Sequence, residues 1–261
     1  DMKERWKHKT WLIDLDGTMY RGKKQIPGAI ELISYLQKEK IPYCFVTNNA
    51  MRTKKQNVAH MEALGFHGIK EDEFFTSAMA AARYVARMSD RRNAYYIGED
   101  GLREALLENG FTIVDDHSDF VFVGLSRSKT YMDYSKAFEQ LWNGAKLIGT
   151  NCDRRLADGD HFLIGNGSIV EMLAYASEQE SLKLGKPYAS MLEETLAYLN
   201  KRKEDCIILG DNMETDIAFG ALHGVETILV ESGVHTAADC ARYAFAPSAC
   251  YHDLFACMDD E

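Results

Sequence analysis

Short apolar runs alternate with amphipathic stretches along most of the chain. The apolar runs that predict strands are KTWLIDLD, PYCFVTNN, NAYYIG, DFVFVG, KLIGT, CIILGDN and VETILVESG. The stretches whose apolar residues recur at helical spacing are residues 28–39, 99–109, 130–143, 167–178, 188–200 and 215–222. Strands that alternate with helices across short turns predict a parallel sheet covered by helices.

Local signals mark the ends of some of these helices. Thr53 and Gln56 form a capping-box pattern, and Gly65 stands where the helix that follows them should end. Pro187 suits the first position of the helix near residues 188–200. Each signal supports the helix predicted next to it.

Length and composition allow either one large domain or two smaller ones. The chain has 261 residues, of which 46% are hydrophobic, and this is enough for a substantial core. No internal repeat, low-complexity stretch or proline-rich linker marks a boundary. Any division into domains must therefore be inferred from the chemistry.

Net charge, hydropathy and cysteine content limit the classes of binding partner and the cell compartment that we expect. The net charge is −10 and no basic stripe with interleaved aromatic residues occurs, which argues against nucleic-acid polymers but allows a small anionic substrate. No apolar run is long enough to cross a bilayer, and the first residues, DMKERWKHKTW, lack the apolar middle of a signal peptide. These two absences predict no membrane partner and a cytoplasmic location. The six cysteines form no CxxC pair, and in a reducing cytoplasm we expect them to be free thiols.

Polar side chains follow three of the predicted strands at the point where each strand ends. Asp14 and Asp16 follow the first strand, and Thr47 and Asn48 follow the second. Asp211 follows the strand CIILG. Because ligands of open parallel sheets bind beyond the carboxyl ends of the strands, we expect these side chains to share one edge of the sheet.

Two further residues fit the same place. Lys186 precedes a predicted helix in the segment GKP, and Asp216 lies about one helical turn beyond Asp211. Taken singly, each of these segments is more often a polar turn, a cap or a solvated loop, but their joint order favours a common site. The isolated histidines are assigned to the surface or to packing: His161, His223 and His235.

These side chains suit a metal ion and a phosphoryl group. Asp14, Asp16 and Asp211 would repel one another at a common point unless a cation lay between them. A site with few protein oxygen ligands suits Mg²⁺, which keeps waters and shares phosphate oxygens of a substrate. Donors for the remaining phosphoryl oxygens are the Thr47 hydroxyl, the Asn48 backbone N–H and Lys186.

Four motifs in this order resemble those of the haloacid dehalogenase (HAD) superfamily of phosphohydrolases: DLDGTMY, TNN, GKP and GDNMETD. The stretches TNNAMRTKKQ, YYIGEDG and GDNMETDIAFGALHGVETILVESGV also resemble its NagD-type branch, which includes nucleotide phosphatases and 4-nitrophenylphosphatase-like proteins. The resemblance covers residues 10 to 250 and implies an α/β fold. A doubly wound, Rossmann-like parallel-sheet core would comprise residues 1–78 and 185–261, and an inserted smaller α/β cap domain of the C2 type would comprise residues 79–184.

The resemblance also implies a role for each matching residue. Asp14 would be the nucleophile that forms an aspartyl-phosphate, and Asp16 would be the general acid and then the general base. The residues implied to hold the transferring phosphoryl group are Thr47, Asn48 and Lys186, the last of which would also offset negative charge. The groups implied around Mg²⁺ are the carboxylates of Asp14 and Asp211, the backbone carbonyl of Asp16, and Asp216, which would steady the metal shell.

The loop TNCDRRLADGD departs from the family pattern. Relatives usually carry a proline soon after TN-x-D, and none occurs here before Gly165. Asn151 and Asp153 in this loop, and Arg52 after TNN, are candidates for substrate contacts, whereas Cys152 is taken as a passive loop cysteine. The substrate can therefore not be transferred from any one relative.

These observations predict a Mg²⁺-dependent phosphatase that hydrolyses a small phosphomonoester through an aspartyl-phosphate intermediate. The substrate would be a nucleoside monophosphate, a sugar phosphate or a similar metabolite. Two alternatives stay open, a phosphotransferase or phosphomutase on the same core and a non-catalytic protein that binds a phosphorylated metabolite. Loss of Asp14 or Asp16 would mark the non-catalytic alternative, and both are present. The oligomeric state is not predicted, and a homo-oligomer stays open.

Overall fold

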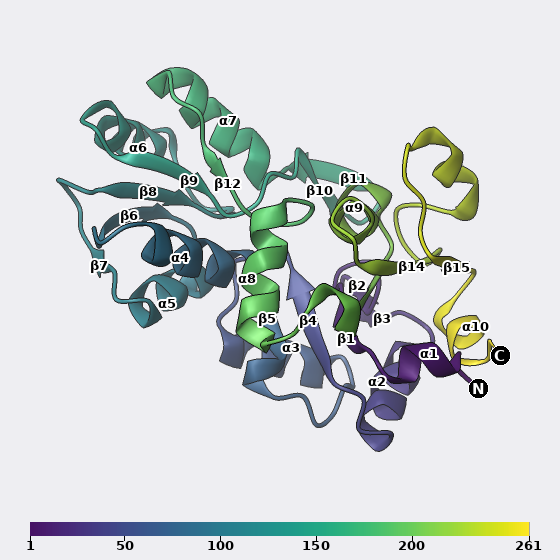
Figure 1. Ribbon diagram of the computed structural model, residues 1–261. Coiled ribbons are helices and arrows are strands. Elements are labelled where there is room, and N and C mark those ends of the chain that lie inside the picture. Colours follow the sequence, from purple (N-terminus) through teal and green to yellow (C-terminus); the bar gives the residue numbers. More distant parts are fainter. Residues whose placement is uncertain (261) are drawn as a thin grey trace. The chain divides into compact units, whose positions relative to one another are not determined.

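The computed structural model describes residues 1–260 of the chain and contains two parallel sheets with helices around them (Figure 1). The larger sheet has six strands in the order β15-β14-β13-β1-β4-β5. Their bounds are Thr10–Ile13 (β1), Tyr43–Thr47 (β4), Phe74–Thr76 (β5), Cys206–Gly210 (β13), Glu226–Val230 (β14) and Ala249–Tyr251 (β15). β1 pairs in parallel with β13 and β4, and β14 pairs in parallel with β13 and β15. The parallel core sheet expected from the sequence is confirmed.

The smaller sheet has five strands in the order β12-β9-β8-β6-β7. Their bounds are Asn93–Ile97 (β6), Thr112–Ile113 (β7), Phe120–Val123 (β8), Lys146–Gly149 (β9) and Leu182–Lys183 (β12). Its neighbouring strands all pair in parallel. The chain thus has a second parallel α/β layer of its own.

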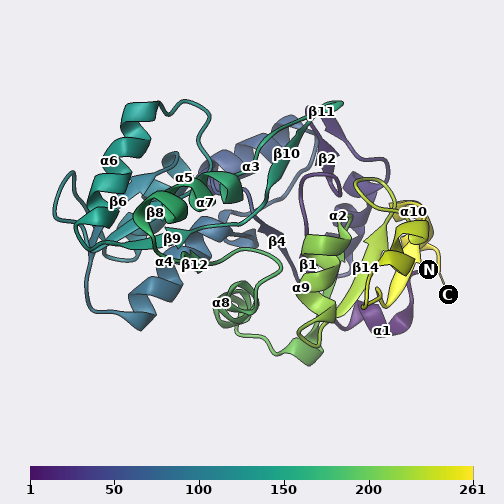
Figure 2. The same cartoon turned by 90° about the horizontal axis from the view of Figure 1, so that it is seen from above.

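Four helices cover the two faces of the smaller sheet. They are α4 (Ser77–Met88), α5 (Asp100–Glu108), α6 (Tyr131–Trp142) and α7 (Asn166–Ser177). Figure 1 shows α6 and α7 above the strands and α4 and α5 below them, and Figure 2 shows α6 and α7 lying over β6, β8 and β9. Val121 and Val123 of β8 pack with Leu141 and Leu173 in one buried cluster. Apolar side chains on both faces of the strands therefore account for the layered arrangement.

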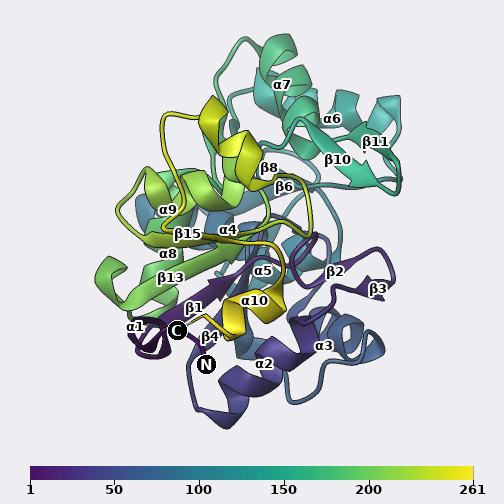
Figure 3. The same ribbon diagram turned by 90° about the vertical axis from the view of Figure 1, so that its right-hand side faces the viewer.

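The central strands of the larger sheet are apolar on both faces. Every residue of β1, β4 and β13 is buried. Parallel strands that are covered on both faces read as continuous apolar runs, as TWLI, YCFVT and CIILG do. Figure 3 shows β13, β1 and β4 running side by side. Because these neighbours point the same way, the residues that follow them share one edge of the sheet.

A short hairpin and several helices accompany the larger sheet. The hairpin pairs β2 (Tyr20–Arg21) with β3 (Lys24–Gln25). The helical elements are α1 (Glu4–Lys7), α2 (Ala29–Lys38), α3 (Lys54–Ala63), α9 (Ala218–Ala221), α10 (Leu254–Met258), a π-helical segment at Met213–Ile217 and 3₁₀ turns at Glu71–Glu73, Lys203–Asp205 and Ala237–Arg242. The first and last of the described residues lie near α1 and α10 (Figure 1), and Lys3 and Asp260 form an ion pair of 3.4 Å.

The chain forms two compact units. The first comprises Asp1–Thr47, Lys55–Phe75 and the chain from Thr195 onward, and the second comprises Asn48–Lys54 and Thr76–Glu194. An α/β core with a separate, smaller α/β layer is the predicted fold class, which is confirmed. The predicted domain boundaries stay a prediction, and the one after residue 78 falls inside α4.

Several elements were not predicted from the sequence. α4 was overlooked, although the Thr76 side chain caps its start by accepting the Met79 N–H (3.2 Å). The hairpin of β10 (Arg155–Asp158) and β11 (His161–Ile164) was expected to be a loop.

The position predicted for Pro187 was wrong. The helix in question, α8, spans Ala189–Leu199, so Pro187 precedes it. The Tyr188 N–H donates to the Gly185 carbonyl (3.0 Å), and this turn delays the start of the helix. Among residues 1–260, no helix has both the length and the apolarity needed to cross a bilayer.

Candidate active site

Three carboxylates gather beyond the carboxyl ends of β1 and β13. Asp14 directly follows β1, Asp211 directly follows β13, and Asp216 lies in the π-helical segment after it. One carboxylate oxygen from each residue lies within 4.8 Å of the other two. Asp211 and Asp216 are buried, and Asp14 is half-buried. The structure thus brings together carboxylates that are far apart in the sequence because β1 and β13 are neighbouring strands.

The electrostatics of this cluster favour a bound cation. Burial, and after it the charges of Asp14 and Asp216, raise the pKa of Asp211 well above its usual value. A cation between the carboxylates would have the opposite effect, because it stabilises the charged form of each. Clustered carboxylate oxygens are the ligands that suit Mg²⁺. The residues present therefore fit the magnesium ion predicted from the sequence.

Hydrogen bonds fix the orientation of Asp211. Its Oδ1 accepts a hydrogen bond from the Thr18 hydroxyl (3.0 Å), and its Oδ2 accepts one from the Val234 N–H (2.9 Å). The Thr18 hydroxyl also lies 3.3 Å from Asp14 Oδ2. Since a hydroxyl has a single proton, it can donate to only one of the two carboxylates at a time. Thr18 therefore links the two aspartates and leaves lone pairs on both for a cation.

Asp216 is oriented by the backbone of the strand end that it faces. Its Oδ2 accepts hydrogen bonds from the N–H groups of Asp211 (3.1 Å) and Asn212 (3.2 Å). Gly210 permits this approach, because a Cβ there would lie 2.2 Å from Asp216 Cβ. The two carboxylates are thus held against the same turn of backbone.

Two glycines allow the backbone to come close to Asp211. Gly17 has a φ of +86°, a conformation that glycine adopts at low cost, and a Cβ there would lie 2.4 Å from Asp211 Oδ2. A Cβ on Gly233 would lie 1.9 Å from the same oxygen. Any larger residue at either position would therefore displace the carboxylate.

Two more of the predicted residues lie at the same edge of the larger sheet. Asp16 is exposed in the turn after β1, where the Gly17 N–H donates to the Tyr20 carbonyl (2.8 Å). Thr47 is buried and ends β4, the other neighbour of β1. The strand order thus places Thr47 at the strand end next to that of Asp14. The roles of Asp16 and Thr47 stay predictions.

Asn48 and Lys186 meet within the second compact unit. The Lys186 N–H donates to Asn48 Oδ1 (2.8 Å), and Asn48 Nδ2 donates to the Lys186 carbonyl (3.1 Å). The Asn48 side-chain amide thus pairs with both the N–H and the carbonyl of Lys186, as the backbone of a neighbouring β-strand does. Lys186 is 4% exposed. The Asn48 side chain therefore fixes the position of the Lys186 backbone.

Asn151 and Asp153 join the same network. Asp153 Oδ2 accepts hydrogen bonds from Asn48 Nδ2 (3.1 Å) and Asn151 Nδ2 (2.6 Å). Burial raises the pKa of Cys152 to about 11, so its thiol is protonated and unreactive at neutral pH. Arg52 is half-buried in the segment after β4. Substrate contact by Arg52, Asn151 and Asp153 stays a prediction.

Three residues around the carboxylates were not identified from the sequence. Thr18 stands directly after the DLDG segment, and its hydroxyl was the one available signal. Val234 contributes a backbone N–H, which any residue other than proline would offer. His235 was assigned to the surface or to packing; it is buried, and it also accepts a hydrogen bond from the Met213 N–H (2.9 Å).

Known proteins resemble this chain in sequence. A family profile described as haloacid dehalogenase-like hydrolase matches residues 11–112, and a second one, described as HAD-hydrolase-like, matches residues 183–257. The chain is 37% identical over 227 residues to the 5′-nucleotidase YutF of Bacillus subtilis. That alignment covers 87% of this chain and 88% of the relative.

Solved structures also resemble it. NagD from E. coli K-12 aligns with a TM-score of 0.87 at 32% identity and covers 97% of this chain and 98% of its own. The glycerol phosphate phosphatase Rv1692 from Mycobacterium tuberculosis, crystallised in complex with magnesium, aligns with a TM-score of 0.88 at 30% identity. It covers 100% of this chain and 79% of its own.

Proposed function

This chain belongs to the haloacid dehalogenase-like hydrolases, in the branch of NagD and the p-nitrophenylphosphatases, and on that basis we propose that it is a magnesium-dependent phosphatase of small phosphomonoesters. The observation that carries the proposal is the cluster of Asp14, Asp211 and Asp216 at adjacent strand ends. One relative is a 5′-nucleotidase and another is a glycerol phosphate phosphatase. We therefore propose a substrate class, which includes nucleoside monophosphates and sugar phosphates, rather than one compound.

We assign the magnesium site to the carboxylates of Asp14 and Asp211 and the backbone carbonyl of Asp16, with Asp216 steadying the arrangement. The clustering of the three carboxylates and the raised pKa of Asp211 support this assignment. The presence of magnesium in the similar mycobacterial phosphatase supports it too. The ion, when bound, would offset the charges of the carboxylates and of the phosphate, so that an anionic nucleophile can approach an anionic ester.

The proposed reaction has two steps. The Asp14 carboxylate attacks phosphorus, the bond from phosphorus to the leaving alcohol breaks, and Asp16 protonates the leaving oxygen. In the second step Asp16 accepts a proton from water while the water oxygen attacks phosphorus. The bond from phosphorus to Asp14 then breaks, which releases inorganic phosphate and restores the carboxylate. The exposed position of Asp16 in the turn after β1 suits both proton transfers.

The transferring phosphoryl group would be held by the Thr47 hydroxyl, the Asn48 backbone N–H and the Lys186 ammonium group. The Asn48 side chain is already engaged with Asp153 and with the backbone of Lys186. This leaves the backbone N–H as the Asn48 group assigned to phosphate. Lys186 would also reduce the repulsion between the nucleophile and the phosphate.

The remaining parts of the proposal concern the substrate and the location. We assign contacts with the rest of the substrate to Arg52, Asn151 and Asp153. A small phosphorylated metabolite is the proposed partner, with no role for nucleic-acid polymers or membranes, which the net charge of −10 supports. All six cysteines are free, and this supports the proposed cytoplasmic location.

Steady-state hydrolysis of 4-nitrophenyl phosphate tests the function. We expect turnover with MgCl₂, none with EDTA, and none for Asp14→Asn with MgCl₂. The matched control is Asp90→Asn, the same change at an exposed aspartate, which should leave turnover intact. Equal rates with MgCl₂ and EDTA would reject the metal, and normal turnover by Asp14→Asn would reject the nucleophile.

A further inference from the structure

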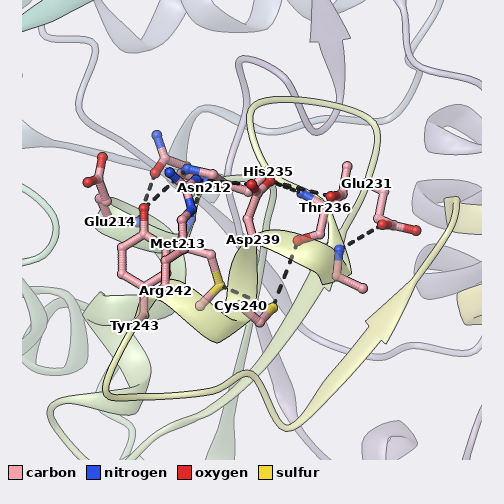
Figure 4. A network of polar contacts seen from close by, with 11 residues as sticks. Asn212, Met213, Glu214, Glu231, His235, Thr236, Asp239, Cys240, Arg242 and Tyr243 are labelled. Carbon is pink, nitrogen blue, oxygen red and sulfur yellow. Dashed lines mark hydrogen bonds and ion pairs between the residues drawn. The ribbon is translucent and has the colours of Figure 1, made fainter.

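His235 lies in the loop that follows β14, where Figure 4 shows it in a polar network with Met213 and Tyr243. The residue is 6% exposed, and its Nδ1 accepts a hydrogen bond from the Met213 N–H (2.9 Å). Its Nε2 lies 3.3 Å from the Tyr243 hydroxyl. Nδ1 acts as the acceptor in this arrangement, and Nε2 faces the Tyr243 hydroxyl.

The backbone of the same loop holds Asp211. The His235 N–H donates to the Asp211 carbonyl (3.0 Å), and the Val234 N–H donates to Asp211 Oδ2 (2.9 Å). The loop thus holds the main chain and the carboxylate of Asp211, while the imidazole holds Met213 two residues later. This stretch leads directly into the π-helical segment that carries Asp216.

The Met213 N–H depends on the His235 imidazole for its hydrogen bond. It is the first N–H of the π-helical segment, and such groups have no acceptor within their own helix. Met213 is fully buried. Removing the ring nitrogen would therefore leave a buried donor unsatisfied, and the turn between the two aspartates would shift to find another acceptor.

We propose that His235 is a positioning residue, which fixes the turn between Asp211 and Asp216 so that both carboxylates face one divalent cation. This inference rests on the proposed function, because it takes the carboxylate cluster as the metal site. His235 would not touch the substrate or the ion. Its effect would pass through the Met213 N–H and the backbone of Asp211, so metal affinity is the quantity it should control.

Metal binding by the purified full chain, without substrate, tests the proposal. Free Mn²⁺ is counted by electron paramagnetic resonance, and MgCl₂ is then added as a competitor. His235→Phe keeps a ring but removes Nδ1, and we expect the dissociation constant for Mn²⁺ to rise about 10- to 100-fold. His235→Asn places an amide oxygen near the position of Nδ1 and should recover most of the affinity. The control is His252→Phe, the same change at a histidine whose side chain is 89% exposed.

The folding of each variant is checked before its affinity for Mn²⁺ is compared. Circular dichroism and melting in EDTA establish that each variant is folded. If His235→Phe does not fold, His235→Gln takes its place in the comparison with His235→Asn. The amide oxygen of Gln lies one methylene further from the backbone than that of Asn. Wild-type affinity in His235→Phe, or equal losses in His235→Phe and His235→Asn, would overturn the proposal. A wild-type protein that binds Mn²⁺ but hydrolyses no phosphomonoester would refute the proposed function alone.

Discussion

Replacement of Gly233 by alanine should disable the carboxylate site while leaving the sheet intact. The new Cβ would lie 1.9 Å from Asp211 Oδ2 and 2.5 Å from its Cγ. Because non-bonded contacts of a Cβ below 3.0 Å essentially do not occur, the Asp211 side chain or the glycine loop must move by about 1 Å. Asp211 is 2% exposed and its carboxylate is held by Thr18 and Val234, so it cannot retreat without breaking these hydrogen bonds.

The size of the effect follows from this displacement. A misplacement of about 1 Å in a reacting constellation can cost about 100-fold in rate, and we expect this loss in kcat for Gly233→Ala. Displacing a ligand should also weaken Mn²⁺ binding about 10- to 100-fold, as changes around metal sites typically do. Both quantities should fall together, because one movement of Asp211 causes both losses.

The assay compares Gly233→Ala with Gly22→Ala, a substitution whose new Cβ has no close neighbour. A Cβ on Gly22 would meet no atom within 4 Å, although its φ of +60° makes alanine strained there by about 1 kcal/mol. Gly22→Ala should therefore keep the kcat for 4-nitrophenyl phosphate and the Mn²⁺ affinity. If Gly233→Ala retained both values as well, the reasoning from close packing against Asp211 would be refuted.

Three further substitutions test the roles assigned to Asp16, Asn48 and Asp211. Asp16→Asn should lower kcat about 10²- to 10⁴-fold, which is the usual contribution of general acid–base catalysis, and normal turnover would exclude that role. Asn48→Ala removes two hydrogen bonds to the Lys186 backbone and should lower kcat/KM about 10-fold, whereas an unchanged value would show that Lys186 needs no such support. The raised pKa of Asp211 means that, without metal, the native state holds its proton to higher pH than the unfolded chain does. The stability of the wild type in EDTA should therefore fall as the pH rises above about 4, until Asp211 is ionised. Asp211→Asn should lose this dependence, melt at a higher temperature than the wild type at pH 7 in EDTA, and gain nothing from MgCl₂; a lower melting temperature would contradict this.

The main strands and their polar ends could be predicted because both leave strong local signals. TWLI, YCFVT and CIILG are continuous apolar runs, as buried parallel strands require, and Asp14, Thr47 and Asp211 stand where those runs end. The order of the strands leaves no such local signal. That β13 and β4 flank β1 is visible in the structure, and this order makes Asp14 and Asp211 neighbours.

The supporting contacts could not be predicted because they depend on backbone groups and on packing. The Val234 N–H that holds Asp211 would be present with almost any side chain at that position. The same holds for the Lys186 backbone that Asn48 engages. The β10–β11 hairpin was missed although its strands are joined by Gly159 and Asp160, a Gly-Asp pair typical of a two-residue hairpin turn. Phe162 and Ile164 of this hairpin are 69% and 67% exposed, so burial in a core does not account for the strand.

Anomalous diffraction from crystals of the protein grown with MnCl₂ would show where the divalent cation binds. We expect one strong manganese peak between the carboxylates of Asp14 and Asp211, beside Asp216, and no peak there in crystals of Asp211→Asn. A wild-type crystal with manganese bound only elsewhere, or with none at this cluster, would contradict the assignment of these three aspartates to a catalytic metal site.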